Sequence, residues 1–306
     1  MTPTVHEHRF REIILPFIIF TTIWGSTWIV IRHQLGIVPA QWSVAYRFLL
    51  AAAAMALLAR IKGHRLRLPP GGLRVAAILG VLQFCINFNA VYLAERHITS
   101  GLVATVFALL LIPNSLFAWA FLGQRPGGRF LASAAIAVAG IILLFVQELR
   151  DSPASSSQIL LGIGLTLIGM IGASAANIFQ AREEALRHPL TVLLAYAMAI
   201  GAAVDAAVAL VLTGPPVFDP RPMYWFGLAY LAIIASALAF SLYFPVVRKI
   251  GPGKAAYSSA LVPLIAMALS TAFEGYRWTV LAAAGAGLAL AGMLLALAGK
   301  GRTIVR

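Results

Sequence analysis

The chain has few charged residues for its length. Asp, Glu, Lys and Arg together make up only 11% of its 306 residues, whereas soluble domains average about 25%. Apolar residues, in contrast, account for 61% of the chain. This balance excludes an ordinary water-soluble domain, and it makes a lipid bilayer the first expected partner.

Reactive and metal-binding residues are also scarce. Cys85 is the only cysteine, so no intrachain disulfide is possible, and a lone thiol in an apolar run usually serves packing. None of the six histidines falls in an apolar run, which removes haem ligation and most metal chemistry inside a membrane. Because facing carboxylate pairs are missing from these runs as well, we expect no enzyme, no catalytic residues, no metal and no cofactor.

The sequence also lacks the motif that nucleotide-driven transport requires. The nearest string to a phosphate-binding loop, Gly251-Pro-Gly-Lys254-Ala, lacks the first glycine and the hydroxyl residue. ATP-driven transport by this chain alone is therefore not expected. The formal net charge of +13 could suggest a nucleic-acid partner, but the basic residues lie between apolar runs rather than on one face, so we expect none.

Long apolar runs follow one another along the whole chain. About 20 residues suffice for a helix to cross a bilayer. The first run contains Pro16 and has no small-residue cleavage site after it, so we interpret it as a retained span rather than a secretory signal. We predict ten spans: 13–32, 42–59, 75–94, 100–121, 129–146, 159–180, 190–212, 223–244, 254–273 and 278–298.

The lysines and arginines orient these spans. With ten spans, 17 of the 23 basic residues fall on the side that holds the N-terminus, 5 fall on the other side, and Arg47 lies inside a span. Basic residues concentrate in cytoplasmic loops, so the N- and C-termini are both predicted to be cytoplasmic. The same bias supports an even number of spans.

An internal repeat divides the chain into two halves. Residues 96–143 match residues 248–295 at a constant offset of 152. Within the match, Phe121-x-Gly123-x-Arg125 recurs as Phe273-x-Gly275-x-Arg277. We therefore divide the chain into a five-helix repeat over residues 1–150 and a second five-helix repeat over residues 151–306.

Because each repeat contains an odd number of helices, the sequence predicts how the two repeats are oriented relative to each other. A second copy that follows five spans enters the membrane upside down. The predicted fold class is thus an all-α integral membrane protein with ten transmembrane helices arranged as two inverted five-helix repeats. Such repeats are a structural basis for alternating access around a central site. A packing scaffold without a transport role is the alternative.

Three short motifs carry a family resemblance. They are Trp24-Gly25-Ser26-Thr27, Tyr46-Arg47-Phe48, and a proline-bearing fourth span that ends in Phe121-Leu-Gly-Gln-Arg-Pro126. With the ten spans and the repeat, they resemble the drug/metabolite transporter superfamily and, within it, the EamA family. The family usually has Gly-Glu-Arg at the helix end, whereas Gln124 and Tyr276 replace the Glu here, so neither position carries an essential acid.

The resemblance implies a function and a location. It implies a multi-pass protein of the bacterial inner (plasma) membrane that exports amino acids or other small metabolites, including aromatic amino acids in YddG-type members. It does not fix the substrate.

Polar and aromatic residues within the spans are the candidates for substrate binding. Polar groups in lipid face a cavity or each other, and here Gln83 and Asn87 lie four apart on one helix face. Amides and rings suit a zwitterion with an apolar or aromatic side chain. Bridges between helices and aromatic belts at span ends are the alternatives. The candidate set is Trp24, Thr27, Tyr46, Gln83, Asn87, Asn177, Gln180, Tyr243, Tyr257 and Ser258.

Two charges and two prolines complete the candidate residues. Arg47 and Asp205 both lie roughly 8–11 Å below the outer boundary, counting ~1.5 Å per residue. Either they form an ion pair or Asp205 titrates as a proton-coupling site, and snorkelling of Arg47 to the interface is the alternative. Pro113 and Pro263 interrupt helix hydrogen bonding in the fourth and ninth spans, so they are candidate hinges or static bends.

The sequence therefore predicts a membrane transporter that works on a small-molecule substrate. We expect it to export amino acids, aromatic or other apolar ones, or similar small metabolites. The alternatives are export or import of drugs or other metabolites and, from a different class, a membrane scaffold or an enzyme subunit. A monomer and a homodimer are both compatible with the sequence.

Overall fold

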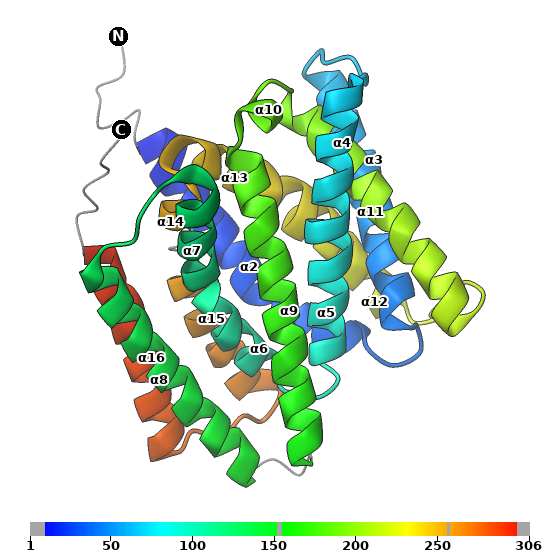
Figure 1. Cartoon of the computed structure of the whole chain (residues 1–306). Helices are drawn as coiled ribbons and strands as arrows, with labels where there is room; N and C mark the ends of the chain where they lie inside the picture. The colour runs from blue at the N-terminus through cyan, green and yellow to red at the C-terminus, as the bar shows by residue number, and fades with distance from the viewer. Residues whose placement is uncertain (1–9, 152–154, 256–257, 299–306) are drawn as a thin grey trace.

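The structure is a computed structural model that describes residues 10–151, 155–255 and 258–298, and within these ranges all regular structure is helical (Figure 1). Helices satisfy their backbone hydrogen bonds within one segment, which a hydrocarbon solvent requires. The elements are η1 Phe10–Ile14, α2 Leu15–Gln34, α3 Ala40–Ile61, α4 Pro70–Leu79, η2 Gly80–Asn87, α5 Phe88–Ala94, α6 Ser100–Phe107, η3 Ala108–Leu110, α7 Leu111–Leu122, α8 Gly128–Asp151, α9 Ser156–Ala181, α10 Glu183–Leu186, α11 Leu190–Thr213, α12 Pro222–Ala229, η4 Tyr230–Leu238, α13 Ala239–Ile250, α14 Pro252–Ala255, α15 Ser258–Phe273 and α16 Val280–Ala298.

Eight continuous helical stretches of the described residues are long and apolar enough to cross a membrane. They coincide with the first eight predicted spans. Two shorter apolar helices, Leu261–Phe273 and Val280–Gly292, coincide with the ninth and tenth. The all-helical membrane fold is confirmed. The count of ten stays a prediction, and so does the cytoplasmic location of the termini, because residues 1–9 and 299–306 lie outside the described ranges.

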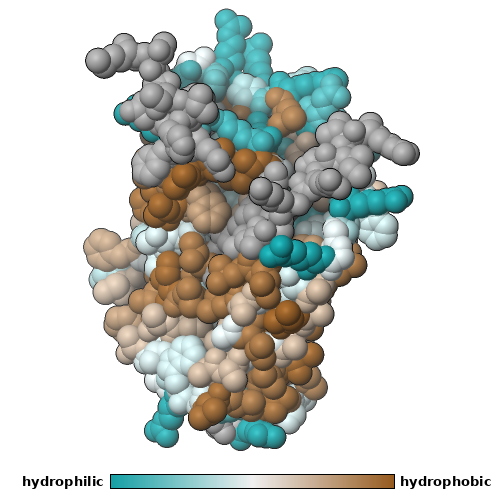
Figure 2. All heavy atoms as spheres, turned by 90° about the vertical axis from the view of Figure 1, so that its left-hand side faces the viewer, coloured by the Kyte–Doolittle hydropathy of each residue, from teal (hydrophilic) through white to brown (hydrophobic). Residues whose placement is uncertain are grey.

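The outer surface is apolar where lipid tails would cover it. On the face that Figure 2 shows, hydrophobic residues form a broad band across the middle of the molecule, and hydrophilic residues gather at its two ends. Side chains on α3, α11 and α16 such as Leu57, Val211 and Val280 are largely exposed. In water a patch of this extent would drive aggregation, so the band indicates the bilayer as its solvent.

The third and eighth spans change their helix type midway. The third runs through α4, η2 and α5, and the eighth runs through α12, η4 and α13. Both η2 and η4 are π-helical, a wider winding that is rare and frequently marks functional sites. The hydropathy pattern did not predict these segments. They occupy corresponding places in the two repeats, within about two residues of the 152 offset.

Helices α8 and α16 lie antiparallel, side by side, at one edge of the bundle (Figure 1). Glycines bring the two backbones together. A Cβ added at Gly140 would approach backbone atoms of Ala289 and Gly285 closer than 3.0 Å, which real Cβ atoms essentially never do. Small residues at a helix interface allow this close approach in membranes, where dispersion contacts drive association.

These glycine contacts are reciprocal under the repeat. Gly292 is the counterpart of Gly140, and its added Cβ would meet the backbone of Ala137 and Ser133. Those two residues are the counterparts of Ala289 and Gly285 at the 152 offset. In the same way, Gly123 and Gly275, which end equivalent helices, have similar left-handed φ values of 69° and 71°. The duplication is therefore expressed in backbone geometry as well as in residue identity.

The other long antiparallel pair is α3 with α11, on the opposite side of the bundle in Figure 1. These are the predicted second and seventh spans, so Arg47 and Asp205 are carried by neighbouring helices. The remaining spans lie between the two pairs, with α2, α9, α13 and α15 near the middle. This arrangement leaves the polar stripes of the central helices facing inward.

The two candidate hinge prolines differ in their surroundings. Pro113 follows the short 3₁₀ segment η3, and it lacks the N–H that would bond to the Leu109 carbonyl. Pro263 lies inside α15, which continues through it without a change of helix type. Only the fourth span is thus interrupted at its proline, and the hinge role of both residues stays a prediction.

The glycine contacts generate a stability prediction. Gly292→Ala should destabilise the protein by about 1–3 kcal/mol, because its methyl group overlaps the backbone of α8. Gly287→Ala is the matched control in the same helix, since an added Cβ there meets nothing within 4 Å. Thermal unfolding of the purified protein in detergent compares the two. Equal midpoints for both variants would contradict the close packing of α8 on α16.

Candidate substrate cavity

A cavity lies among the central helices. Its lining comes from α2, α3, η2, α5, α6, η3, α9, α13 and α15, whereas α8, α11 and α16 contribute nothing described. The lining residues are Trp24, Thr27, Trp28, Ile31, Arg47, Gln83, Asn87, Phe88, Val91, Ala104, Phe107, Ala108, Leu110, Ala173, Asn177, Phe240, Tyr243 and Val262. The cavity is thus mostly apolar, with a few polar groups, as ligand sites generally are.

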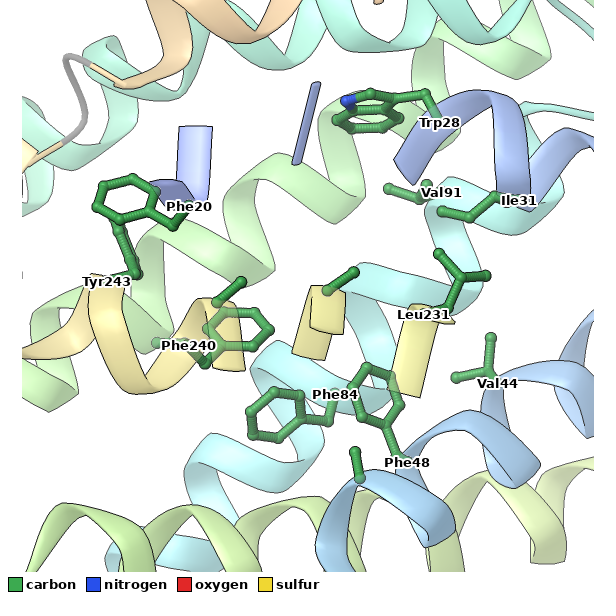
Figure 3. Close-up of a cluster of buried hydrophobic side chains, with 14 of the residues drawn as sticks. Phe20, Trp28, Ile31, Val44, Phe48, Phe84, Val91, Leu231, Phe240 and Tyr243 are labelled. Carbon is green, nitrogen blue, oxygen red and sulfur yellow. The ribbon is translucent and has the colours of Figure 1, made fainter. Parts of the chain in front are cut away.

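Aromatic rings form a connected wall, in which Trp24, Phe240 and Tyr243 line the cavity and Phe84 and Phe48 do not. The Trp24 ring lies 4.8 Å from Tyr243 and 5.2 Å from Phe240, centroid to centroid. Phe240 in turn meets Phe84 edge-on at 5.3 Å, and Phe84 lies 4.9 Å from Phe48. Figure 3 shows Tyr243, Phe240, Phe84 and Phe48 following one another across the interior. Tilted and edge-on rings at these distances attract one another beyond simple burial.

The polar groups of the cavity include amides, hydroxyls and one charge. Asn87 and Asn177 each have a buried side-chain oxygen that meets no donor among the described residues. The Asn177 amide also donates to Asn114 Oδ1 at 3.4 Å, so Asn177 bridges helices as well as lining the cavity. The Thr27 hydroxyl donates to the Trp24 carbonyl at 2.7 Å within its own helix. Buried amide oxygens without partners are costly, and a ligand with an N–H group would satisfy them.

Six of the ten predicted substrate residues line this cavity. They come from four different helical stretches, and they are Trp24, Thr27, Gln83, Asn87, Asn177 and Tyr243. Whether they bind substrate stays a prediction. Tyr257 lies outside the described residues, and of Ser258 only its place at the start of α15 is described.

Two predicted residues lie elsewhere. The Tyr46 hydroxyl donates to the Val217 carbonyl at 3.1 Å, and its ring stacks on Phe218 at 5.7 Å in a loop at the end of the bundle. The Gln180 side-chain oxygen accepts from Arg248 at 3.0 Å. Tyr46 thus behaves as an aromatic residue of the interface, and Gln180 as a bridge between helices. These contacts agree with the alternatives to substrate binding that the sequence left open, which are an aromatic belt for Tyr46 and a bridge between helices for Gln180.

Arg47 and Asp205 do not form an ion pair with each other. Arg47 Nε donates to Ser236 Oγ at 3.0 Å, whereas Asp205 Oδ1 accepts from Asn89 Nδ2 at 2.6 Å. Their helices are adjacent, but Arg47 turns toward η4 and Asp205 toward the third span. The prediction that they pair is therefore wrong. Snorkelling of Arg47 is wrong as well, because its side chain is fully buried and lines the cavity.

Some lining residues were not among the predictions. Trp28 and Ile31 follow Trp24 at helical spacing, and Phe88 and Val91 follow Phe84 in the same way. The helical spacing of these residues can be read from the sequence. Hydropathy alone, however, does not tell whether an apolar face of a span meets lipid or the cavity. The buried acid Glu95 was also missed, because it lies one residue beyond the end of the predicted third span.

The family of the chain follows from this fold and its two halves. A model of the EamA-like transporter family matches residues 12–146 and again residues 160–298. The chain belongs to the EamA-like transporter family. It is therefore a transporter rather than an enzyme, and a multi-pass protein of the bacterial inner membrane.

Several relatives of this EamA-like transporter are known by name. It is 27% identical to the uncharacterized inner membrane transporter YedA of Escherichia coli K12, over 87% of this chain and 85% of that protein. It is 25% identical to a probable amino-acid metabolite efflux pump of the same strain, over 91% and 92% of the two chains. Protein PagO of Salmonella typhimurium is 23% identical over 87% and 86%.

A solved crystal structure has the same fold. It matches with a TM-score of 0.68 at 22% identity, and the match covers 92% of this chain and 95% of that one. At this level of identity the likeness supports the fold alone.

The aromatic wall generates a second prediction. Trp24→Ala should destabilise the EamA-like transporter by about 3 kcal/mol, because it removes three ring contacts and the hydrogen bond from Nε1 to the Ala235 carbonyl at 3.1 Å. Trp119→Ala is the control, since that ring is 47% exposed on the outside of α7. Thermal unfolding in detergent measures both. A Trp119 variant as unstable as the Trp24 variant would contradict the assignment of Trp24 to a buried, stabilising aromatic wall.

Proposed function

We propose that this protein exports amino acids with apolar or aromatic side chains, or similar small metabolites, by alternating access around the central cavity. The observation that carries the proposal is the cavity itself, where an aromatic wall meets unpartnered amide oxygens. Rings suit an apolar side chain, and amide oxygens suit an ammonium group. A relative that is named a probable amino-acid metabolite efflux pump supports both the substrate class and the direction.

Alternating access would use the two repeats as its moving parts. Residues 1–150 and 151–306 each contain one match to the family model. The reciprocal contacts of Gly140 and Gly292 support a two-fold relation between the copies, because a two-fold axis makes residue pairs exchange roles. Inverted repeats that share a central site can rock around it to open either side.

The proposed orientation rests on the basic loops. The turns between α3 and α4, around α10, and between α7 and α8 lie at one end of the bundle in Figure 1. They carry lysines and arginines that the sequence assigns to the cytoplasm, including Arg65, Arg125 and Arg187. We place that end in the cytoplasm. Ten spans, with the two shorter apolar helices included, would bring both termini to the same side.

A contact at the other end supplies a candidate gate. Ser100, at the start of α6, donates to Glu274 just beyond α15, with 2.5 Å between the two side-chain oxygens. Arg32, at the end of α2, lies 3.8 Å from the same carboxylate. These three residues join the first, fourth and ninth predicted spans. Opening toward the outside would require these contacts to break.

Reconstitution into liposomes tests the proposed function. We expect the purified chain alone, with no nucleotide, to catalyse counterflow of a labelled apolar or aromatic amino acid at a rate well above that of empty liposomes. The panel contains phenylalanine, leucine, a polar amino acid and a cationic drug. Flux of the drug with no flux of any amino acid would instead support a drug exporter. Neither flux nor binding for any member would contradict transport of these classes.

A second experiment addresses energy coupling. Asp205 is fully buried, and its Oδ2 meets no donor within the described ranges, so we propose it as the proton-coupling group. We expect Asp205→Asn to remove the acceleration of transport by a proton gradient, and to leave counterflow without a gradient intact. Transport rates across a pH series in liposomes measure this.

The control for this experiment is another acid-to-amide change. Glu183→Gln removes an exposed carboxylate whose ion-pair partner, Arg187, is exposed as well. This variant should therefore leave the transport rate and its pH profile unchanged. An unchanged rate and pH profile in the Asp205 variant would rule out coupling through this residue. Facilitated diffusion down a gradient would then be the better description.

A further inference from the structure

Arg47 is a buried charge with most of its hydrogen-bonding capacity unused. Helix α3 carries it to the centre of the bundle, where its relative exposure is 0%. Its Nε donates to Ser236 Oγ at 3.0 Å, but Nη1 and Nη2 have no hydrogen-bond partner among the described residues. A guanidinium has five N–H donors, so four of them remain unsatisfied. A buried charge with unsatisfied donors is strongly destabilising, as is a buried ion pair that has lost one partner.

The neighbouring groups do not satisfy these donors. The guanidinium carbon lies 4.3 Å from the Phe88 ring centroid and 5.3 Å from that of Phe48, and these rings attract the cation without supplying an acceptor in the guanidinium plane. The Tyr92 hydroxyl lies close enough to Arg47 to interact with it, but it makes no well-formed hydrogen bond to either terminal nitrogen, and it donates its own proton to Gln34 Oε1 at 3.0 Å.

A buried acid that interacts with Arg47 also leaves it unpaired. Glu95 is fully buried and close enough to interact with Arg47 electrostatically, but no ion pair joins the two residues. Both carboxylate oxygens of Glu95 lack a donor within the part of the chain that the structure describes. The two opposite charges are thus held apart. The terminal nitrogens of Arg47 are therefore left without a hydrogen-bond partner from Glu95.

Arg47 also lines the cavity, and the described lining contains no Asp, Glu or Lys. It is therefore the single formal charge in an otherwise neutral chamber. A cation that entered would be repelled, whereas a carboxylate that reached the buried, planar guanidinium would meet two parallel N–H groups. This bidentate geometry is the strongest hydrogen-bonded pairing that a side chain offers to a carboxylate.

We infer that Arg47 binds the carboxylate of the transported molecule. The inference rests on the proposed function and deepens it, because it restricts the substrate to small carboxylates with an apolar or aromatic body. The unpartnered oxygens of Asn87 and Asn177 are acceptors in the same cavity. An amino acid uses both kinds of group, whereas an acid without the amine uses Arg47 alone. Cationic drugs are excluded as substrates.

The first test changes the ligand and leaves the protein intact. Binding to the purified protein is followed by tryptophan fluorescence, since Trp24 and Trp28 line the cavity, and counterflow is measured in liposomes. The ligands are phenylalanine, its amide, 3-phenylpropanoate and phenethylamine. We expect the two acids to bind about 10- to 100-fold more tightly than the amide or the amine. Phenylalaninamide or phenethylamine binding as tightly as phenylalanine would overturn the inference.

The same measurements test the proposed transport function and the role of Arg47 separately. Flux of phenylalanine and its amide at equal rates would leave the proposed function standing and overturn the role of Arg47. Selective binding of the acids without any flux would support the role of Arg47 and count against transport. An absence of both binding and flux would overturn both. Phenylalanine and 3-phenylpropanoate binding equally would assign the site to carboxylates in general rather than to amino acids.

The second test changes the protein. Arg47→Gln should weaken phenylalanine binding about 10- to 100-fold while phenylalaninamide binding changes less than about threefold, so that selectivity for the acid is lost. Arg47→Lys should recover part of the affinity, because it keeps the charge without the bidentate fork. Retained binding of the amide shows that the Gln variant is folded. Unchanged selectivity in this variant would overturn the inference.

A double variant distinguishes recognition from charge balance. If Arg47 served only to neutralise Glu95, adding Glu95→Gln to Arg47→Gln would restore phenylalanine binding, because neither of these two buried charges would remain. Under our inference the double variant binds phenylalanine as weakly as Arg47→Gln does. Restoration to within about threefold of the original affinity would overturn the role of Arg47 as the carboxylate-binding residue.

Discussion

The structure depends on one constraint, which is that hydrocarbon offers no hydrogen bonds. Every backbone N–H and C=O in the membrane must find its partner within the protein, so the described chain is helical wherever its structure is regular. The same constraint governs side chains. A polar group in a span must meet another polar group or a cavity, and Asn89 with Asp205, and Gln180 with Arg248, do the first. Groups of cavity-lining residues that have no hydrogen-bond partner among the described residues, such as the terminal nitrogens of Arg47, are therefore informative about ligands.

Close packing is the second consequence of this solvent. Lipid tails are as apolar as leucine, so the helices gain little from burial alone, and small residues that bring backbones together replace it. Gly140, Gly285 and Gly292 do this between α8 and α16. The duplicated sequence places Gly140 and Gly292 at equivalent positions, and the counterpart of Gly285 is another small residue, Ser133. One set of small residues thus builds both sides of the interface, and this edge of the bundle is separated from the cavity that the central helices enclose.

The sequence predicted the helices better than it predicted the cavity. Span positions follow from hydropathy, which integrates over about 20 residues and tolerates local irregularity. The π-helical segments η2 and η4 escaped it, because a change of winding leaves hydropathy unaltered. Gln83 and Asn177 were found because an amide is unusual in an apolar span, and Trp24 was found because it shares a face of the first span with Thr27. Trp28, Phe107 and Phe240 were not, because an aromatic ring suits lipid, a core and a cavity equally well.

The sequence by itself determined the class of protein, its spans, its duplication and its family, because composition, periodicity and short motifs are local properties of the chain. Only the tertiary structure decided what each polar residue faces. Tyr46 and Arg47 are adjacent in one helix, and one meets a loop at the end of the bundle while the other meets the central cavity. Arg47 and Asp205 match in depth on neighbouring helices and still have different partners. The direction in which a side chain points depends on how its helix is rotated against its neighbours, and that rotation is settled by contacts between residues far apart in the sequence.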